Sequence, residues 1–166
     1  EYIRKALKMP VVCGTLKDAQ FEDGRFDLVT MHEYLEHEPN PLSVLKEARR
    51  ITKNGGHINI EIPYIGGLPP KIFGSRWSQW DVPRHLVFFT PESLENMLKL
   101  CGYKLISVRT FGIPFVIGMS VLHSLGFNNL GAIGGVGWFF VGLAGLPFLP
   151  FMPFMHELMS VIARAE

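Results

Sequence analysis

The chain has 166 residues and a net charge of +1, which suits a single domain and gives no electrostatic argument for nucleic-acid binding. Cys13 and Cys101 lie far apart and form no CxxC or zinc-binding spacing, which favours a reducing compartment. Composition changes near residue 110. The residues before it are typical of an α/β protein, whereas residues 110–155 contain no Asp, Glu, Lys or Arg.

The first third of the chain predicts alternating helices and strands. We expect a helix over residues 2–8, an apolar strand over 9–13 and a second strand over 26–31. Asn40 is a typical N-cap for a helix that has Pro41 at its first position, and Gly55 is the expected left-handed stop of that helix.

The next predicted strand covers residues 57–62 and alternates in polarity. Its isoleucines share one face, and the polar residues His57, Asn59 and Glu61 share the other. A strand that is buried on both faces is uniformly apolar, so one face of this strand is expected to meet a polar site.

The remaining elements of the soluble part follow an aromatic stretch. Residues 64–89 are expected to be irregular. A helix should then begin after the N-cap Thr90 and end at Gly102. Strands are expected over residues 103–109 and 158–163, on either side of the uncharged segment. Together these elements predict an α/β fold, in which ligands bind where parallel strands end.

Three stretches, in this order and spacing, resemble one family. They are the strand–loop–helix–strand unit Phe26–Pro63 with its Leu35-Glu36-His37 triplet, the aromatic stretch Arg76–Thr90, and the closing run Met159–Arg164. The chain is thereby similar to class I S-adenosylmethionine-dependent methyltransferases, and in particular to their ubiquinone-pathway O-methyltransferase-like branch. The resemblance implies a doubly wound, mostly parallel sheet whose last strand is antiparallel, and methyl transfer from S-adenosylmethionine.

The chain also departs from that family. The family's first two strands and its glycine-rich GxGxG cofactor loop have no counterpart here, so we interpret the chain as a fragment that begins before the third strand. Residues 1–110 and 156–166 would form the methyltransferase core, and residues 111–155 would form an apolar insertion. Thr15 stands where many members have Asp or Asn.

The resemblance also implies a cofactor site. Gly14, Thr15 and Leu16 would line the adenine pocket, and His32 would touch the cofactor. The alternative for the first three residues is an ordinary turn after a strand, and the alternative for His32 is an exposed loop histidine.

An ExxEH cluster follows the strand over residues 26–31. Glu33, Glu36 and His37 can converge if the loop turns helically, and two carboxylates with one imidazole suit a divalent ion such as Mg²⁺. By resemblance this is a metal site that lowers the pKa of a phenol acceptor. The alternative is that Glu36 and His37 only organise the entry to the helix.

His85 is the candidate general base. It lies in a loop that would cover the site, with Glu61 behind it at the end of a strand. The alternative is a structural histidine that bridges backbone groups.

The uncharged segment predicts membrane association. Residues 111–127 and 130–154 are separated by Asn128 and Asn129, and both parts contain prolines or glycines that make full spans marginal. We expect a hairpin that dips into one leaflet, with both ends on the cytoplasmic side, and the alternative is a buried cap over the substrate pocket. The acceptor would then be a lipid or lipid-linked molecule. The alternative to methyl transfer is a non-catalytic membrane-associated α/β module that has lost the cofactor loop.

Overall fold

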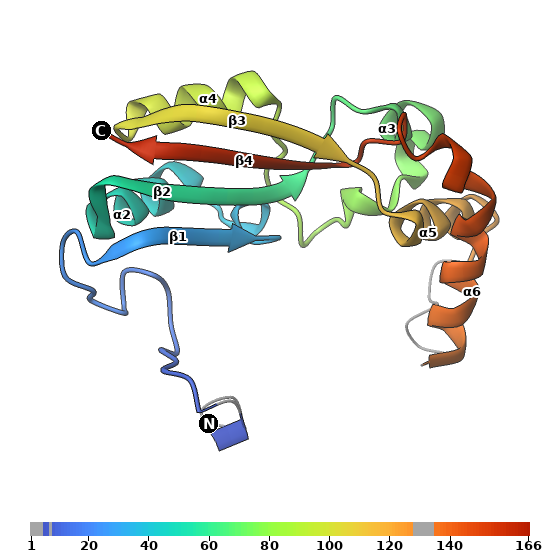
Figure 1. The fold of residues 1–166 in the computed structure, drawn as a ribbon. Coiled ribbons are helices and arrows are strands. Elements are labelled where there is room, and N and C mark those ends of the chain that lie inside the picture. Colours follow the sequence, from blue (N-terminus) through green and yellow to red (C-terminus); the bar gives the residue numbers. More distant parts are fainter. Residues whose placement is uncertain (1–4, 7, 128–134) are drawn as a thin grey trace.

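A mixed four-stranded sheet forms the centre of the molecule (Figure 1). The computed structural model describes residues 5–6, 8–127 and 135–166. The strands are β1 (Phe26–His32), β2 (Thr52–Pro63), β3 (Tyr103–Phe111) and β4 (Leu158–Ala165), in the spatial order β1-β2-β4-β3. β1 and β2 are parallel, and β4 is antiparallel to both β2 and β3. The predictions of an α/β fold and of an antiparallel last strand are confirmed.

Two capped helices cover one face of the sheet. α2 (Pro41–Ile51) begins at Asn40, whose side chain accepts a hydrogen bond from the Ser43 amide at 3.1 Å. α4 (Pro91–Leu100) begins at Thr90, and Thr90 and Ser93 exchange side-chain-to-backbone hydrogen bonds. The helices bury an apolar stripe against the sheet, as expected for amphipathic helices. The buried residues of this layer include Leu45, Ala48, Leu94, Leu98, Ile58, Ile60, Ile62, Met159, Val161 and Ala163.

The junction between α2 and β2 differs from the prediction. The helix ends at Ile51 rather than near Gly55, and β2 begins at once at Thr52. Phe26 pairs with Thr52 but Leu28 pairs with His57, so the intervening residues of β2 bulge out of register. Gly55 does adopt a left-handed conformation, with φ of +79°, but it serves this bulge and not the helix end.

The expected strand over residues 9–13 is wrong. These residues form no regular structure, and Met9 and Val12 are 58 % and 48 % exposed. The segment runs away from β1, which forms an edge of the described sheet (Figure 1). A strand needs a neighbouring backbone to pair with, and apolar composition alone does not supply one. Of the expected helix over 2–8, residues 5 and 6 are helical, and residues 1–4 and 7 lie outside the described residues.

The aromatic stretch is more regular than predicted. It contains α3 (Leu68–Phe73) and two short 3₁₀ turns, η2 (Gly74–Arg76) and η3 (Ser78–Trp80). Trp77, between the two turns, is 1 % exposed. The stretch is therefore anchored in the core even though most of it lies on the surface.

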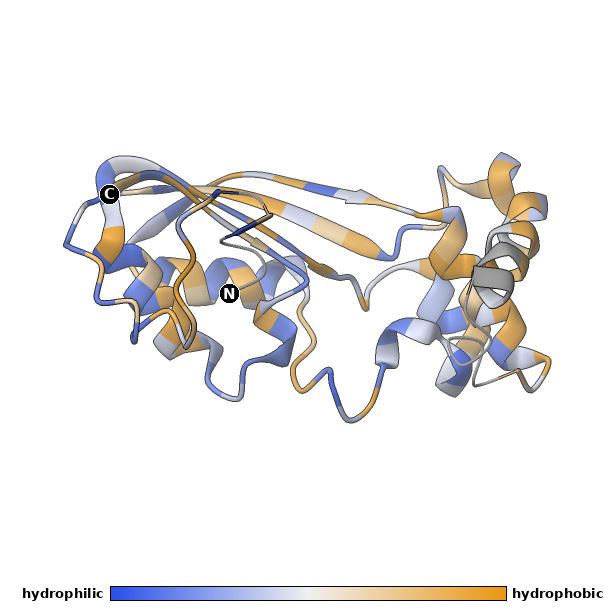
Figure 2. Cartoon of the chain, turned by 90° about the horizontal axis from the view of Figure 1, so that it is seen from below, coloured by the Kyte–Doolittle hydropathy of each residue, from blue (hydrophilic) through white to orange (hydrophobic). Residues whose placement is uncertain are grey.

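The uncharged segment forms a separate apolar lobe. It comprises α5 (Pro114–Ser124), α6 (Gly135–Gly145) and the 3₁₀ helix η5 (Leu146–Phe151), and its hydrophobic colouring stands out in Figure 2. The predicted turn at Asn128 and Asn129 lies outside the described residues. Within the described part of the chain, no helix has the length and hydropathy that a membrane crossing requires.

Glycines set the distance between α5 and α6. An added Cβ at Gly118 would lie 2.1 Å from the Val141 carbonyl oxygen, and one at Gly145 would lie 1.9 Å from that of Pro114. These paired contacts show that the two helices run antiparallel. Backbones can approach this closely only where no side chain separates them.

We predict that Gly118→Ala destabilises the protein by about 1–3 kcal/mol, because the new methyl group overlaps a backbone atom that has no room to move. Gly142→Ala is the matched control. Its Cβ would meet nothing within 4 Å, so helix propensity should stabilise α6 by up to about 1 kcal/mol. Urea unfolding of both variants measures the difference, and equal midpoints would show that the close helix contact is not maintained in solution.

Candidate functional site

The carboxyl ends of β1 and β2 bring three polar side chains together. His32 and Glu61 are cross-strand partners, and His32 Nδ1 lies 3.7 Å from a Glu61 carboxylate oxygen. Glu33 follows in a left-handed conformation, with φ of +46°, and its amide donates to the Glu61 carbonyl at 2.9 Å. This turn directs the chain from β1 into the 3₁₀ turn η1 (Leu35–His37).

The carboxyl groups of Glu33 and Glu36 interact. Burial, reinforced by the charge and hydrogen bonding of Glu36 and by the charge of Glu61, raises the pKa of Glu33 to about 7. Glu36 is 1 % exposed, and apart from Glu33 its carboxylate oxygens have no hydrogen-bond partner among the described residues. A buried carboxylate with unused acceptor sites is costly unless another ligand satisfies it.

The last part of the aromatic stretch docks on η1. The amides of Leu86 and Val87 both donate to the Glu36 carbonyl, at 2.8 and 3.1 Å. His37 Nδ1 lies 2.9 Å from the Arg84 carbonyl oxygen, and His85 Nδ1 lies 2.7 Å from that of Gln79. Because a carbonyl can only accept, each Nδ1 must carry a proton, and in the neutral form of each ring the lone pair therefore lies on Nε2.

Those lone pairs converge with the buried carboxylate. Ligand atoms of Glu36, His37 and His85 all lie within 4.8 Å of one another. His37 Nε2 is 3.9 Å from a Glu36 oxygen, and Asp81 contributes a further oxygen 3.8 Å from His85 Nε2. Histidines that bind metals usually donate their second ring N–H to a carbonyl or carboxylate, as both do here. These three side chains could therefore hold a divalent metal ion.

The structure changes which residues belong to the predicted metal cluster and which residue lies beside the predicted general base. Glu36 and His37 do come together, but the third converging ligand is His85, and Glu33 pairs with Glu36 from outside that set. His85 has Asp81 beside it, whereas Glu61 lies beside His32. The spacing of the ExxEH motif carries no signal for His85, which reaches the cluster only through the docking of its loop.

The predicted cofactor residues line a cavity next to β1. Gly14, Thr15 and Leu16 border a space of about 350 Å³ together with residues 29–31 of β1 and Tyr34. His32 is not part of this lining, and its side chain is 53 % exposed. The Thr15 hydroxyl donates to Asp18 at 2.7 Å, and this hydrogen bonding lowers the pKa of the Asp18 carboxyl.

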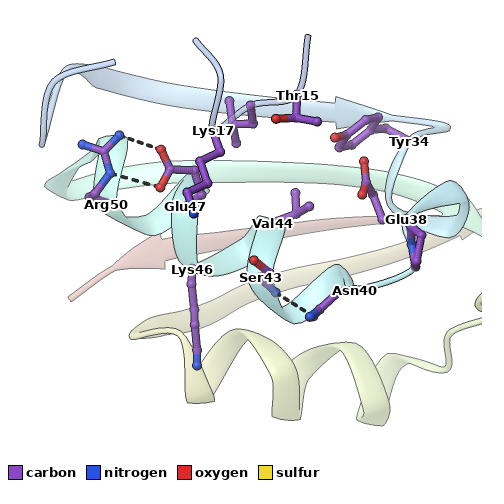
Figure 3. Close-up of a pocket in the computed structure, with 12 residues that line it drawn as sticks. Thr15, Lys17, Tyr34, Glu38, Asn40, Ser43, Val44, Lys46, Glu47 and Arg50 are labelled. Atoms are coloured by element: carbon purple, nitrogen blue, oxygen red, sulfur yellow. Dashed lines mark hydrogen bonds and ion pairs between the residues drawn. The ribbon is translucent and has the colours of Figure 1, made fainter. Parts of the chain in front are cut away.

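A second cavity, of about 550 Å³, lies between the same loop and α2 (Figure 3). Thr15, Leu16 and Tyr34 line both cavities and so separate them. Burial and a hydrogen bond to Glu38 raise the pKa of Tyr34 to about 12, so its hydroxyl remains a donor at physiological pH. On the α2 side, Arg50 pairs with Glu47 at 2.6 Å. The loop after residue 13 thus has binding space on both of its sides.

Comparison with known proteins places the chain in a family. Residues 8–108 match the model of a methyltransferase domain. A ubiquinone biosynthesis O-methyltransferase of Vibrio parahaemolyticus is 40 % identical over 52 residues, which are 31 % of this chain and 22 % of that protein. A demethylmenaquinone methyltransferase of Bacillus cereus is 26 % identical over 129 residues, covering 66 % of this chain and 53 % of its own length. The chain therefore spans about half or less of these curated relatives.

Solved structures share the fold. A SAM-dependent methyltransferase from Archaeoglobus fulgidus superimposes with a TM-score of 0.61 at 18 % identity, over 96 % of this chain and 69 % of that one. A possible histamine N-methyltransferase from Thermotoga maritima gives a TM-score of 0.62 at 17 % identity, over 99 % and 69 %. At such low identity these neighbours establish only a Rossmann-like methyltransferase fold. The match over residues 8–108 shows that the chain belongs to the methyltransferase domain family.

Proposed function

We propose that the protein transfers the methyl group of S-adenosylmethionine to an oxygen atom of a small acceptor, at the carboxyl ends of β1 and β2. The observation that carries this proposal is the convergence of Glu36, His37 and His85 beside these strand ends. Family membership supports methyl transfer, and quinone-pathway methyltransferases are among the curated relatives. The cavity lined by residues 14–16 supports binding of the adenine end of the cofactor beside β1.

The reaction is an in-line displacement. A bond forms between the acceptor oxygen and the methyl carbon while the bond from that carbon to the sulfonium sulfur breaks, which leaves S-adenosylhomocysteine. The acceptor hydroxyl must also lose its proton. Most of the protein's contribution is alignment of the two reactants and removal of that proton.

A divalent ion fits the donor set. One carboxylate and two imidazoles favour a transition-metal ion, such as Mn²⁺ or Zn²⁺, over the Mg²⁺ that an all-oxygen cluster would prefer. The unsatisfied oxygens of buried Glu36 are consistent with a bound cation. A metal ion held there supplies a positive charge that lowers the pKa of an acceptor hydroxyl.

His85 can act in either of two ways. With Nδ1–H donated to Gln79, its Nε2 lone pair can bind a metal or accept the proton of the acceptor, but it cannot do both at once. The effect of metal chelation on the rate distinguishes these two roles. If His85 is a ligand, chelation and His85→Ala should have the same effect; if it is a base, only the substitution should slow an already metal-free enzyme.

We predict that His85→Ala lowers methyl transfer by the full-length protein by about 10²–10⁴-fold, the usual contribution of a positioned acid–base or metal-polarising group. Glu36→Gln should weaken Mn²⁺ binding in calorimetry and lower the rate in parallel. His57→Ala is the matched control, because His57 lies in the middle of β2, where it pairs with Leu28, and not at the carboxyl end where Glu61 pairs with His32. Rates within tenfold of the wild type in folded His85→Ala and Glu36→Gln proteins would contradict the proposal.

The apolar lobe supports a membrane-bound acceptor. Among its described residues are large hydrophobic side chains that are about half or more exposed, including Leu125, Phe127, Leu143, Leu146, Leu149, Phe151 and Phe154. The segment from Thr110 to Met155 has no Asp, Glu, Lys or Arg to interrupt this surface. Exposed apolar side chains in such number are typical of an interaction site, and we propose that the lobe enters one leaflet of a bilayer and brings the site to a lipid or lipid-linked acceptor.

Vesicle sedimentation tests the membrane proposal. The full-length protein should sediment with phosphatidylcholine–phosphatidylglycerol vesicles, and the double variant Leu146→Glu/Phe151→Glu should remain in the supernatant, because charged groups resist burial in acyl chains. Leu100→Glu on α4 is the control, since Leu100 is 73 % exposed but lies outside the apolar lobe. Equal sedimentation of the double variant and the wild type would contradict lobe-mediated binding.

A further inference from the structure

Glu157 is a buried acid at the base of the apolar lobe. It directly precedes β4 and is 0 % exposed. Its amide donates to the Phe111 carbonyl at 3.0 Å, and its carbonyl accepts from the Tyr64 amide at 2.8 Å. One side-chain oxygen, Oε1, accepts from the Ile113 amide at 3.0 Å. Through these hydrogen bonds, Glu157 connects the segment that enters the lobe after β3 with the segment that leaves it before β4. It also connects both segments to the end of β2.

The Trp77 indole lies close to the Glu157 carboxyl group. Glu157 Oε2 and Trp77 Nε1 are both buried, and neither forms a hydrogen bond of regular geometry with another described group. The indole N–H is nevertheless close enough to lower the pKa of the Glu157 carboxyl, as the Ile113 amide also does. Burial outweighs both contacts and raises that pKa to about 8. At neutral pH the group is therefore mainly a neutral acid.

From Trp77 a series of ring contacts leads to the candidate site. Trp77 packs edge-to-face on Trp80 with centroids 5.2 Å apart, and Trp80 packs on Phe88 at 4.9 Å. Phe88 contacts the His85 ring at 6.1 Å, and His85 contacts His37 at 4.8 Å. Edge-to-face pairs have a preferred geometry, so the position of one ring restrains the next.

We propose that Glu157 is a positioning residue, whose carboxyl group fixes Trp77 and, through the aromatic contacts that follow, holds His85 in its orientation at the site. The inference rests on the proposed function, because it assigns His85 a role there. These contacts connect the base of the apolar lobe to the site. A shift of the lobe at its base should therefore change the orientation of the His85 ring.

The proposal carries a pH signature. The groups that face Glu157 are the Ile113 amide, the Tyr64 amide and the Trp77 indole, none of which is charged, and the neighbouring His156 turns its Nδ1 to the Thr110 hydroxyl at 2.6 Å. The folded-state pKa of about 8 exceeds the ordinary value of 4.5, so the folded state holds a proton that the unfolded state releases. Stability from this group is therefore highest below about pH 4.5 and falls as the pH rises to about 8.

The test compares Glu157→Gln and Glu157→Leu in the full-length protein, with Glu92→Gln on the exposed side of α4 as the matched control. The readout is the imidazole ¹H–¹⁵N spectrum of His85, which reports the Nδ1–H tautomer without cofactor, metal or acceptor. Wild-type His85 signals should shift between pH 7 and 9 as Glu157 ionises. They should stay constant in Glu157→Gln, which is neutral throughout and retains the shape of the acid. In Glu157→Leu they should be displaced at every pH.

Two results would overturn the inference. One is a pH response of His85 in Glu157→Gln equal to that of the wild type. The other is a folded Glu157→Leu protein with wild-type His85 signals, which would leave Glu157 a purely structural role. In steady-state assays, Glu157→Leu should lower kcat at least tenfold with KM changed less than twofold, and Glu157→Gln should restore it. Absence of methyl transfer in the wild type would count against the proposed function and leave the spectroscopic test intact.

Discussion

The sheet depends on the return of the chain as β4. β2 and β3 run in the same direction but do not pair with each other, and β4 fills the space between them with antiparallel ladders on both sides. The chain must therefore leave the end of β3, form the apolar lobe, and come back to the same end of the sheet. The lobe is closed at its base for this reason. Gly112 and Gly67 allow the backbones to cross there, since a Cβ at either position would lie 2.0 Å or less from a carbonyl oxygen of Met155 or His156.

This closure also determines where the chemistry can occur. The base of the lobe lies beside the end of β2, and the aromatic stretch that follows β2 packs against it through Trp77 and through Ser78, whose hydroxyl donates to the Val116 carbonyl of α5 at 3.1 Å. The same stretch then continues to His85. The apolar lobe, the aromatic stretch and the polar cluster are thus consecutive parts of one packed arrangement.

Local signals in the sequence were sufficient for most of the fold and insufficient for the site. The caps Asn40 and Thr90 were predictable because their hydrogen bonds reach only three residues along the chain. The strand over residues 9–13 was not, because strand formation depends on a partner that composition does not reveal. The participation of His85 depends on how a distant loop docks on η1. For Glu157, the sequence shows only that it is the first charged residue after the uncharged segment.

The proposed metal role of the site, with His85 as a ligand and not as a base, requires that Glu36, His37 and His85 bind one ion at the carboxyl end of β1. The most direct measurement is anomalous diffraction from crystals of the full-length protein grown with Mn²⁺ and S-adenosylhomocysteine. We expect a single strong anomalous peak within bonding distance of the Glu36 carboxylate and of Nε2 of both histidines, with the adenine beside Thr15. Ordered S-adenosylhomocysteine with no anomalous peak among these three side chains would contradict it.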